Sequence, residues 1–476
     1  MIYRNLINGE WREGASAATN VNPSDLSDVV GEFARADTRQ AVEAVGAADA
    51  AQPGWAALPG GARFDVLDTA GTEILARADE LGDLLAREEG KTLREATAEV
   101  RRAGQILKFH AGEAVRNPGE HLGSVRPGVE VLVSREPVGV VSIITPFNFP
   151  MAIPAWKIAP ALAHGNTVVF KPAELVPASA WNLVDILHRA GLPDGVLNLV
   201  MGRGRDVGDT LTGSPNVNAV SFTGSASTGR GVLASAQRHG ARVQLEMGGK
   251  NPLVILDDAD LDAAVAGALE GSFGSTGQRC TASSRLIVTD RIHDEFIDRL
   301  KAAMCELQVG DARDPGTTMG PVVDQSQLDQ DLRYIEVATK EGASLFGGEL
   351  LQRATRGHYL SPALLVDTKS THTVNREEVF GPVASMVRVA DFDEALATAN
   401  DTEFGLTSGI YTRSLRASTQ FRRESTAGMV MVNVPTAGVD YHVPFGGRRG
   451  SSYGTREQGR DARDFYTTTK TSYMAT

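Results

Sequence analysis

STGQRCTA, residues 275–282, is the stretch that most constrains the fold and chemistry of this 476-residue chain. It contains Cys280, one of only two cysteines. Small residues let the backbone approach a ligand closely. A lone thiol among them is suited to attack an electrophilic carbon. Because the thiolate is the nucleophile, we expect a site that favours the thiolate. The other cysteine, Cys305, lies in a helical pattern, where we expect an inert residue of the core. Cys280 is therefore the candidate nucleophile.

Three further runs carry groups that would complement such a thiol. TPFNFP at 145–150 contains Asn148, LEMGGK at 245–250 contains Glu246, and EEVFGP lies downstream at 377–382. A side-chain amide can donate a hydrogen bond to an oxyanion, and a carboxylate can activate a water molecule. Four such runs in this order indicate an enzyme that works through a covalent cysteine intermediate.

The order of these runs and the residues within them resemble the aldehyde dehydrogenase superfamily along essentially the whole chain. GQRCTASSRLIV at 277–288 and AGVDYHVPFGGRRGSSYGTREQG at 437–459 are most similar to bacterial 2-oxoglutarate semialdehyde dehydrogenases, also called 2,5-dioxovalerate dehydrogenases. The resemblance implies an α/β fold with a Rossmann-type cofactor domain, an α/β catalytic domain and a small β sheet for oligomerisation. It also implies oxidation of an aldehyde to a carboxylate, with 2-oxoglutarate semialdehyde as the expected substrate.

The same resemblance gives each catalytic candidate a role. Cys280 attacks the aldehyde to form a thiohemiacetal, and the Asn148 amide together with the Cys280 backbone N–H binds the oxyanion. Glu246 then activates the water that hydrolyses the thioester. Coenzyme A-acylating members generally lack this glutamate, so its presence favours release of a free acid.

Short β-branched runs alternate with alanine-rich amphipathic stretches, a pattern typical of parallel α/β units. We expect helices at 41–51, 65–77, 177–190, 259–274 and 293–306, and strands at 138–144, 167–170, 219–222, 251–256 and 285–289. By resemblance, the NAD-binding domain comprises 1–117 and 137–248, the catalytic domain 249–447, and the oligomerisation strands 118–136 and 460–476. In those last segments, 124–136 and 465–472 look like strands without a helix partner. By resemblance they pair in a sheet that joins subunits; the alternative is a pair of edge strands within one subunit.

The usual dinucleotide fingerprint G-x-G-x-x-G is absent from the sequence. A better phosphate site is the run FTGS at 222–225, at the end of an expected strand. The helix that follows would offer its N-terminal N–H groups to a pyrophosphate. The sequence therefore predicts a dinucleotide site around Gly224 and Ser225.

The resemblance extends this prediction to contacts with each part of the cofactor. Ser225 contacts the pyrophosphate, Lys171 and Glu174 bind the adenosine ribose, and Glu378 and Phe380 hold the nicotinamide. The full set of implied cofactor-binding residues is Thr145, Phe147, Lys171, Glu174, Gly224, Ser225, Glu378 and Phe380. We expect NAD, with weaker use of NADP, because the Glu174 carboxylate would repel a 2′-phosphate.

Arg279 directly precedes Cys280, and its guanidinium could pair with a substrate carboxylate through two hydrogen bonds. The alternative is an outward-facing salt bridge. By resemblance, the substrate site is formed by Phe149, Trp156, Arg279, Thr281 and Phe445. Succinic semialdehyde dehydrogenases resemble one another in two arginines, at positions where this chain has Trp156 and Gly274. These departures favour a five-carbon oxo-acid semialdehyde.

Other functions stay open. A broad-specificity enzyme, or a succinic or glutaric semialdehyde dehydrogenase, would share the catalytic residues and differ in the lining of the substrate site. A catalytically silent homologue would be a structural protein. A hydrolase is not expected: GSSYG at 450–454 matches a nucleophile elbow, but no histidine follows Ser452, so we expect a glycine-rich loop.

Lysine and arginine total 47 against 59 aspartate and glutamate, a net charge of −12. No basic stripe offsets that balance, so nucleic acid is not an expected partner. The sequence shows neither a signal peptide nor the ~20-residue apolar segment that crosses a membrane, and two cysteines make no disulfide framework. The histidines show no ligand spacing, so no metal is expected. We expect a cytoplasmic homo-oligomer, a dimer or a tetramer, that acts on a small-molecule aldehyde.

Overall fold

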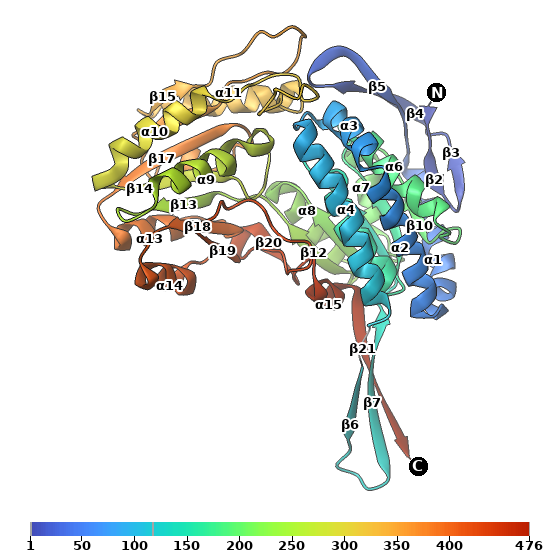
Figure 1. Ribbon diagram of the computed structural model, residues 1–476. Coiled ribbons are helices and arrows are strands. Elements are labelled where there is room, and N and C mark those ends of the chain that lie inside the picture. The colour runs from blue at the N-terminus through green and yellow to red at the C-terminus, as the bar shows by residue number, and fades with distance from the viewer. Residues whose placement is uncertain (1, 117–118, 476) are drawn as a thin grey trace.

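The computed structural model describes residues 2–116 and 119–475, which form two α/β halves and a projecting arm (Figure 1). The first half contains a sheet of eight strands in the order β20-β12-β11-β8-β9-β10-β2-β3. Its strands are β2 (Asn5–Ile7), β3 (Glu10–Arg12), β8 (Val140–Ile144), β9 (Thr167–Lys171), β10 (Leu197–Leu199), β11 (Ala219–Thr223), β12 (Arg242–Glu246) and β20 (Ser452–Tyr453). The central five, β8 to β12, run parallel.

These parallel strands follow the Rossmann order. The chain passes from β8 outward to β9 and β10, then returns to the other side of β8 for β11 and β12. The order therefore reverses between β8 and β11, and ligands of such sheets bind in the crevice at this point, beyond the carboxyl ends of the strands. β8 ends just before the TPFNFP run and β11 just before Gly224. The expected Rossmann-type domain is confirmed.

Helices cover both faces of this sheet. They are α1 (Thr38–Ala57), α2 (Gly60–Ala76), α3 (Ala78–Glu89), α4 (Leu93–Ala114), α5 (Ala152–Ala163), α6 (Pro177–Arg189), α7 (Gly204–Gly213) and α8 (Ala226–Gln237). Alternate residues of β9 point to opposite faces: Val168 and Phe170 pack in the cluster of α2 to α6, and Val169 in the cluster of α1, α7 and α8.

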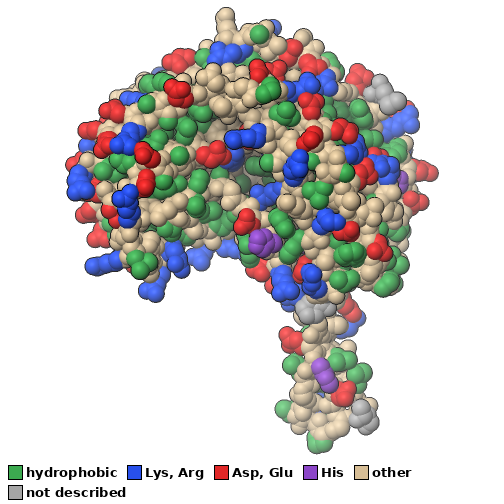
Figure 2. Space-filling view, viewed as in Figure 1, with side chains coloured by type: hydrophobic (Ala, Val, Ile, Leu, Met, Phe, Trp, Pro, Cys, Tyr) green, Lys and Arg blue, Asp and Glu red, His purple; other side chains and the backbone are tan. Residues whose placement is uncertain are grey.

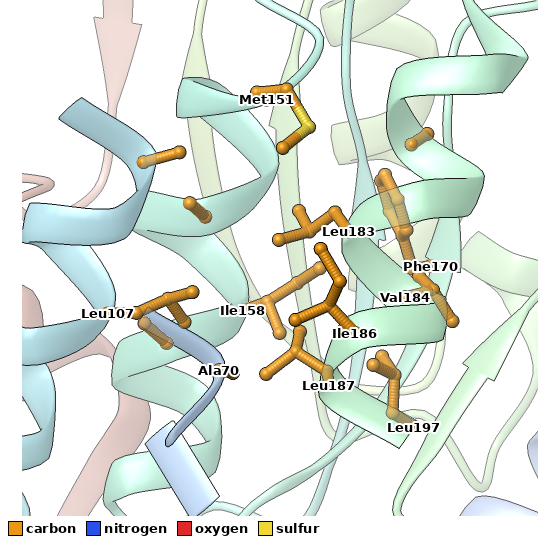
Figure 3. Packing of buried hydrophobic residues seen from close by; sticks show 14 of the residues in the cluster. Ala70, Leu107, Met151, Ile158, Phe170, Leu183, Val184, Ile186, Leu187 and Leu197 are labelled. Atoms are coloured by element: carbon orange, nitrogen blue, oxygen red, sulfur yellow. The ribbon is translucent and has the colours of Figure 1, made fainter. Parts of the chain in front are cut away.

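Helix α5 is apolar apart from Lys157, and all of its residues are buried. Figure 3 shows Ile158 of α5 facing Leu183 and Leu187 of α6, and all three side chains are fully buried. Truncating a side chain in such packing to alanine costs about 2–5 kcal/mol. The core therefore holds α5 firmly, and with it the TPFNFP run that leads into this helix.

The second half contains a seven-stranded sheet in the order β15-β16-β17-β14-β13-β18-β19, parallel except for β15. Its strands are β13 (Asn251–Ile255), β14 (Ser283–Thr289), β15 (Ser344–Gly347), β16 (Ala363–Val366), β17 (Val383–Val389), β18 (Thr407–Tyr411) and β19 (Met429–Val432). Its helices are α9 (Leu261–Phe273), α10 (His293–Cys305), α11 (Gln325–Lys340), α12 (Thr373–Arg376), α13 (Phe392–Asn400) and α14 (Leu415–Glu424). Each helix and strand expected from the sequence in the two halves is present, with differences at the ends.

The arm is an antiparallel sheet of β6 (Glu120–Gly123), β7 (Val129–Pro137) and β21 (Thr467–Ala475). The chain enters β21 through the short helix α15 (Arg463–Tyr466). The expected pairing of 124–136 with 465–472 is confirmed as β7 with β21. Figure 2 shows the arm standing clear of the body with hydrophobic side chains on its surface. Leu122 of β6 and Tyr473 of β21 are exposed.

Several elements were not expected from the sequence. A small sheet of β1 (Ile2–Tyr3), β4 (Ser16–Asn22) and β5 (Asp25–Arg35) flanks the first half, and α3, α4 and β6 were also missed. The expectation for Cys305 was wrong, because it is exposed at the end of α10 while its neighbour Met304 faces the core. We propose the domain limits given above, since the first sheet takes strands from both 1–117 and 137–248.

None of the described helices is long and apolar enough to cross a membrane. Within the described ranges, no cluster of three or more His, Cys, Asp or Glu side chains could hold a metal ion.

Candidate active site

A cavity of about 380 Å³ opens beside Cys280 and brings the substrate candidates together. Its lining includes Cys280 and the five predicted substrate residues, Phe149, Trp156, Arg279, Thr281 and Phe445. They come from α5, the segment just before it, the cysteine loop and the segment near 445, which are far apart in the sequence. The fold thus places the thiol and the predicted substrate residues on one cavity.

The cysteine loop connects α9 to β14 through an unusual backbone. Ser275, Thr276 and Gly277 have φ angles of 48°, 57° and 67°, all in the left-handed region. A Cβ on Gly277 would lie 2.1 Å from the Gly381 carbonyl oxygen, so only glycine fits there. Asn251 Nδ2 fixes the far side of the loop by donating to the Cys280 carbonyl at 2.7 Å.

Cys280 is partly exposed, and its surroundings disfavour the thiolate. Burial raises the pKa of the thiol above its ordinary value, and the nearby carboxylates of Glu378 and Glu246 raise it further. Only its own backbone N–H acts in the opposite direction. In the chain without cofactor, burial is thus the largest effect against the thiolate, and the two carboxyl groups add to it. The expected site that favours the thiolate stays a prediction.

Asn148 lies in the segment between β8 and α5, and its side chain reaches the cysteine loop. Nδ2 donates to the Gln278 carbonyl at 2.8 Å, and the Asn148 carbonyl accepts from Lys91 Nζ at 2.5 Å. An amide nitrogen carries two N–H donors, so one remains for a further acceptor. The structure thus brings this amide to the loop that contains Cys280, and its role as an oxyanion donor stays a prediction.

Glu246 ends β12 and is buried. Its Oε2 accepts a hydrogen bond of 2.5 Å from the Ser452 hydroxyl, while its Oε1 has no partner among the described residues. Burial raises the pKa of Glu246 well above its ordinary value, and the nearby Glu457 carboxylate adds to this effect. A raised pKa makes the ionised carboxylate a stronger base, so Glu246 can take a proton from water once it has lost its own.

The crevice between β8 and β11 fits a dinucleotide. Ser225 caps the N-terminus of α8 by accepting from the Thr228 N–H at 3.3 Å. Thr145, just after β8, and Thr223, at the end of β11, each hold a buried hydroxyl without a partner in the described chain. Free hydroxyls and helix N–H groups at this crevice suit a pyrophosphate, as predicted for Gly224 and Ser225.

Lys171 and Glu174 lie at the end of β9, the second strand of the Rossmann unit, where an acidic residue typically binds the adenosine ribose. Lys171 is buried, and burial lowers the pKa of its amine. Oε2 of Glu174 lies 3.7 Å from a nitrogen of Arg35 and 3.7 Å from one of Arg203. These two arginines were missed by the sequence reasoning, since they lie far from Glu174 along the chain.

Glu378 and Phe380 lie between α12 and β17. Glu378 accepts from the Gly249 N–H at 2.9 Å, and burial raises the pKa of its carboxyl to about 7. A Cβ on Gly248 would lie 1.9 Å from Oε2 of Glu378, so a larger residue at 248 would displace this carboxylate. Phe380 meets Phe147 edge to face at 5.8 Å between ring centroids. Two cofactor candidates from separate halves are thus in contact.

Trp156, in the aromatic wall of the cavity, is positioned by the buried ion pair of Lys157 and Glu457. Trp156 and Phe445 have ring centroids 5.4 Å apart. Trp156 Nε1 donates to Oε2 of Glu457 at 2.8 Å, and Oε1 of Glu457 accepts from Lys157. Phe149 receives the Lys91 ammonium over its ring at 3.8 Å from the centroid. Glu457, Lys157 and Lys91 were also missed.

Arg279 lines the cavity, but its guanidinium already has partners. Nη2 lies 2.9 Å from Oε1 of Glu95, and Nη1 lies 2.9 Å from Oε1 of Glu270. Its Nε donates to the Ser275 hydroxyl at 3.1 Å. Two carboxylates thus neutralise this arginine, which matches the salt bridge considered as its alternative, although the bridge lies at the cavity. Its contact with a substrate carboxylate stays a prediction.

Comparisons with known proteins agree with this geometry. The model of the Aldehyde dehydrogenase family matches residues 11–472. Alpha-ketoglutaric semialdehyde dehydrogenase of Bacillus subtilis (strain 168) is 42% identical, covering 99% of this chain and 98% of that protein. Glutarate-semialdehyde dehydrogenase of Pseudomonas putida is 38% identical over 95% of each.

A solved structure shows the same fold. Betaine aldehyde dehydrogenase of Staphylococcus aureus, in complex with NAD+, superimposes with a TM-score of 0.96 at 32% identity, covering 99% of this chain and 95% of that one. The family match spans nearly the whole chain, including Cys280, Glu246 and Asn148. The chain belongs to the aldehyde dehydrogenase family and is an oxidoreductase that acts on aldehydes.

Proposed function

We propose that this chain oxidises 2-oxoglutarate semialdehyde to 2-oxoglutarate with NAD, through a thioester on Cys280. The observation that carries the proposal is the single cavity on which Cys280 and the predicted substrate residues converge. The 42% identity to a protein named for this substrate, over almost the full length of both chains, supports the choice of aldehyde.

In the proposed mechanism, the Cys280 sulfur attacks the aldehyde carbon and charge develops on the carbonyl oxygen. The free N–H of Asn148 and the backbone N–H of Cys280 donate to this oxygen; losing one such donor costs about a hundred- to a thousandfold in rate. Glu246 then takes a proton from the water that cleaves the thioester, and Ser452 holds its carboxylate in place.

NAD, when bound, accepts the hydride that the aldehyde carbon loses. We propose that Ser225 and Gly224 contact its pyrophosphate, that Lys171 and Glu174 hold the adenosine ribose, and that Glu378 positions the nicotinamide ribose. The remaining predicted contacts are those of Thr145, Phe147 and Phe380.

We also propose that the chain forms a homo-oligomer in which the arm packs against a second copy. Leu122 and Tyr473 are exposed on this sheet, and apolar side chains on a projecting antiparallel sheet favour such a contact. A nucleophilic thiol has to stay reduced, which is consistent with the cytoplasm.

The test is a steady-state assay of the purified chain with NAD, in which 2-oxoglutarate semialdehyde, glutarate semialdehyde and pentanal are compared. We expect the highest kcat/KM with 2-oxoglutarate semialdehyde and formation of one 2-oxoglutarate for each NAD reduced. Glutarate semialdehyde is the second candidate, because the Pseudomonas putida relative is named for it. Absence of NAD reduction with every aldehyde would contradict the proposal.

A further inference from the structure

Two arginines line the cavity beside Cys280, and only one of them is neutralised. Arg279 is paired with Glu95 and Glu270, as described above. Arg102 forms no hydrogen bond or ion pair with any residue in the described part of the chain, and its Nε and Nη2 are buried without a partner. The cavity thus contains one guanidinium whose donors are free.

Arg102 belongs to one face of α4. Ala98 and Glu99 lie three and four residues after Glu95 and four and three before Arg102, and all four residues line the cavity. Helical spacing therefore directs the Arg102 side chain to the same space as the Cys280 thiol. Firm packing of α4 against α2 and α5 holds this face in position.

The carboxylate nearest to Arg102 on its own helix is already committed. Oε2 of Glu99 accepts from Lys91 Nζ at 2.7 Å, and Oε1 accepts from the backbone N–H groups of Met151 at 2.9 Å and Ala152 at 3.1 Å. Glu99 and Asp440 each attract Arg102 through longer-range electrostatics without a hydrogen bond or ion pair, and Asp440 is exposed to water. Arg102 therefore has no close anionic partner among these groups.

A largely buried guanidinium without a hydrogen-bond partner is costly, because more distant charges replace only part of the hydration that it loses. Burial accordingly lowers the pKa of Arg102. The walls of the cavity around it are largely apolar, with Ile153, Trp156 and Phe445 among the lining residues. A ligand with a hydrocarbon chain and one terminal carboxylate would satisfy both features, since a guanidinium fork binds a carboxylate through two parallel hydrogen bonds.

We propose that Arg102 binds the distal carboxylate of the aldehyde substrate, so that the cavity selects aldehydes with a carboxylate at the far end of the chain. This inference rests on the proposed function and names the residue that confers its substrate class. Cys280 meets the aldehyde end of the molecule and Arg102 the carboxylate end. Arg279, held by two carboxylates, instead shapes the cysteine loop.

The experiment compares two aldehydes of equal chain length, glutarate semialdehyde and pentanal, which differ by a carboxylate in place of a methyl group. In Arg102→Met we expect kcat/KM for glutarate semialdehyde to fall about ten- to a hundredfold, mainly through KM, the range expected for lost hydrogen bonds to a charged group. Pentanal should change less than about twofold. Arg102→Lys should recover only part of the loss, because an ammonium lacks the planar fork.

Arg101→Met is the matched control, since Arg101 is exposed on the same helix and paired with Asp79. It should leave both substrates unchanged. Equal losses for the two substrates in Arg102→Met, or no loss for either, would overturn the proposal. The proposal would also be overturned if Arg279→Met, and not Arg102→Met, lowered kcat/KM for glutarate semialdehyde while leaving that for pentanal unchanged.

The proposed function is judged separately, by whether the wild-type chain reduces NAD with these aldehydes at all. Calorimetric binding of glutarate needs no turnover and tests Arg102 in either case. We expect its affinity to fall about ten- to a hundredfold in Arg102→Met. Unchanged glutarate affinity would contradict the assignment.

Discussion

The hydroxyl of Ser452 donates a hydrogen bond of 2.5 Å to Oε2 of Glu246 across 206 residues of sequence. It connects β20, at one edge of the cofactor sheet, to the end of the neighbouring β12. A hydrogen bond to a carboxylate favours its charged form, so Ser452 lowers the pKa of Glu246, opposing the increase caused by burial and by Glu457. Ser452 thereby sets the pH at which Glu246 becomes a base.

Ser452→Ala should therefore raise the pKa of Glu246. Since Glu246 acts as a base only when ionised, the rising limb of the kcat–pH profile should move to higher pH by about one to two units, the equivalent of a hydrogen bond to a charged group. KM for the aldehyde should stay within about twofold. Tyr453→Phe, which removes an exposed hydroxyl from the same strand, is the control. A profile that falls in height without moving would show that Ser452 does not tune Glu246.

Arg35 and Arg203 flank Glu174 at the predicted ribose site. The carboxylate would repel the 2′-phosphate of NADP, while the two guanidinium groups would attract it. We expect preference for NAD with measurable use of NADP. Arg203→Ala should lower kcat/KM for NADP about tenfold and change that for NAD less than about threefold. Arg238→Ala, at an exposed position beyond α8, should affect neither. An equal loss with both cofactors would place Arg203 away from the phosphate.

Asp331 is a buried carboxyl on α11 whose Oδ2 has no partner among the described residues. Burial raises its pKa to about 8, so the folded chain holds a proton that the unfolded chain releases above about pH 4. Between pH 4 and 8 the folded state binds more protons, and the free energy of unfolding falls as pH rises. Asp331→Asn removes this titration.

The midpoint of thermal unfolding should therefore decrease less from pH 5 to pH 8 in Asp331→Asn than in the wild-type chain. Asp329→Asn, at an exposed position on the same helix, should follow the wild type. Parallel curves for the wild type and Asp331→Asn would mean that Asp331 is ionised in the folded chain.

The sequence predicted the parts of the molecule whose signals are local. Buried strands such as β8, with the sequence VVSII, are rich in β-branched residues, and Cys280 lies in a loop of small residues. Helix α4 was missed although Ala96, Val100, Ala103 and Leu107 form a buried face at helical spacing. That spacing does not reveal that Glu99 and Arg102 line a cavity, because the other walls come from distant parts of the chain. No local sequence pattern predicts a binding role for Arg102, because that role depends on a cavity formed by distant parts of the chain.

The role of Ser452 could not be predicted from the sequence for a different reason. Its run GSSYG matches a hydrolase pattern without the histidine that should follow, and we expected a glycine-rich loop. The structure instead has a short 3-10 helix at Arg449–Ser451 and the edge strand β20 at Ser452–Tyr453. The contact of Ser452 with Glu246 arises from the pairing of β20 with β12, which no local pattern reveals. Arg279 was singled out for its position beside Cys280, whereas its two ion pairs depend on Glu95 and Glu270, contributed by α4 and α9.

The central claim, a thioester on Cys280 that Glu246 hydrolyses, is tested most directly in Glu246→Gln. The Glu246 charge raises the pKa of Cys280, so its removal does not impair ionisation of the thiol. Rapid mixing with NAD and 2-oxoglutarate semialdehyde should give a burst of one reduced cofactor per active site, followed by slow turnover. Mass spectrometry should then find one acyl group on Cys280, and none in Cys280→Ser. A variant without burst and without acyl group would contradict the claim, because Glu246 would then act before the thioester forms.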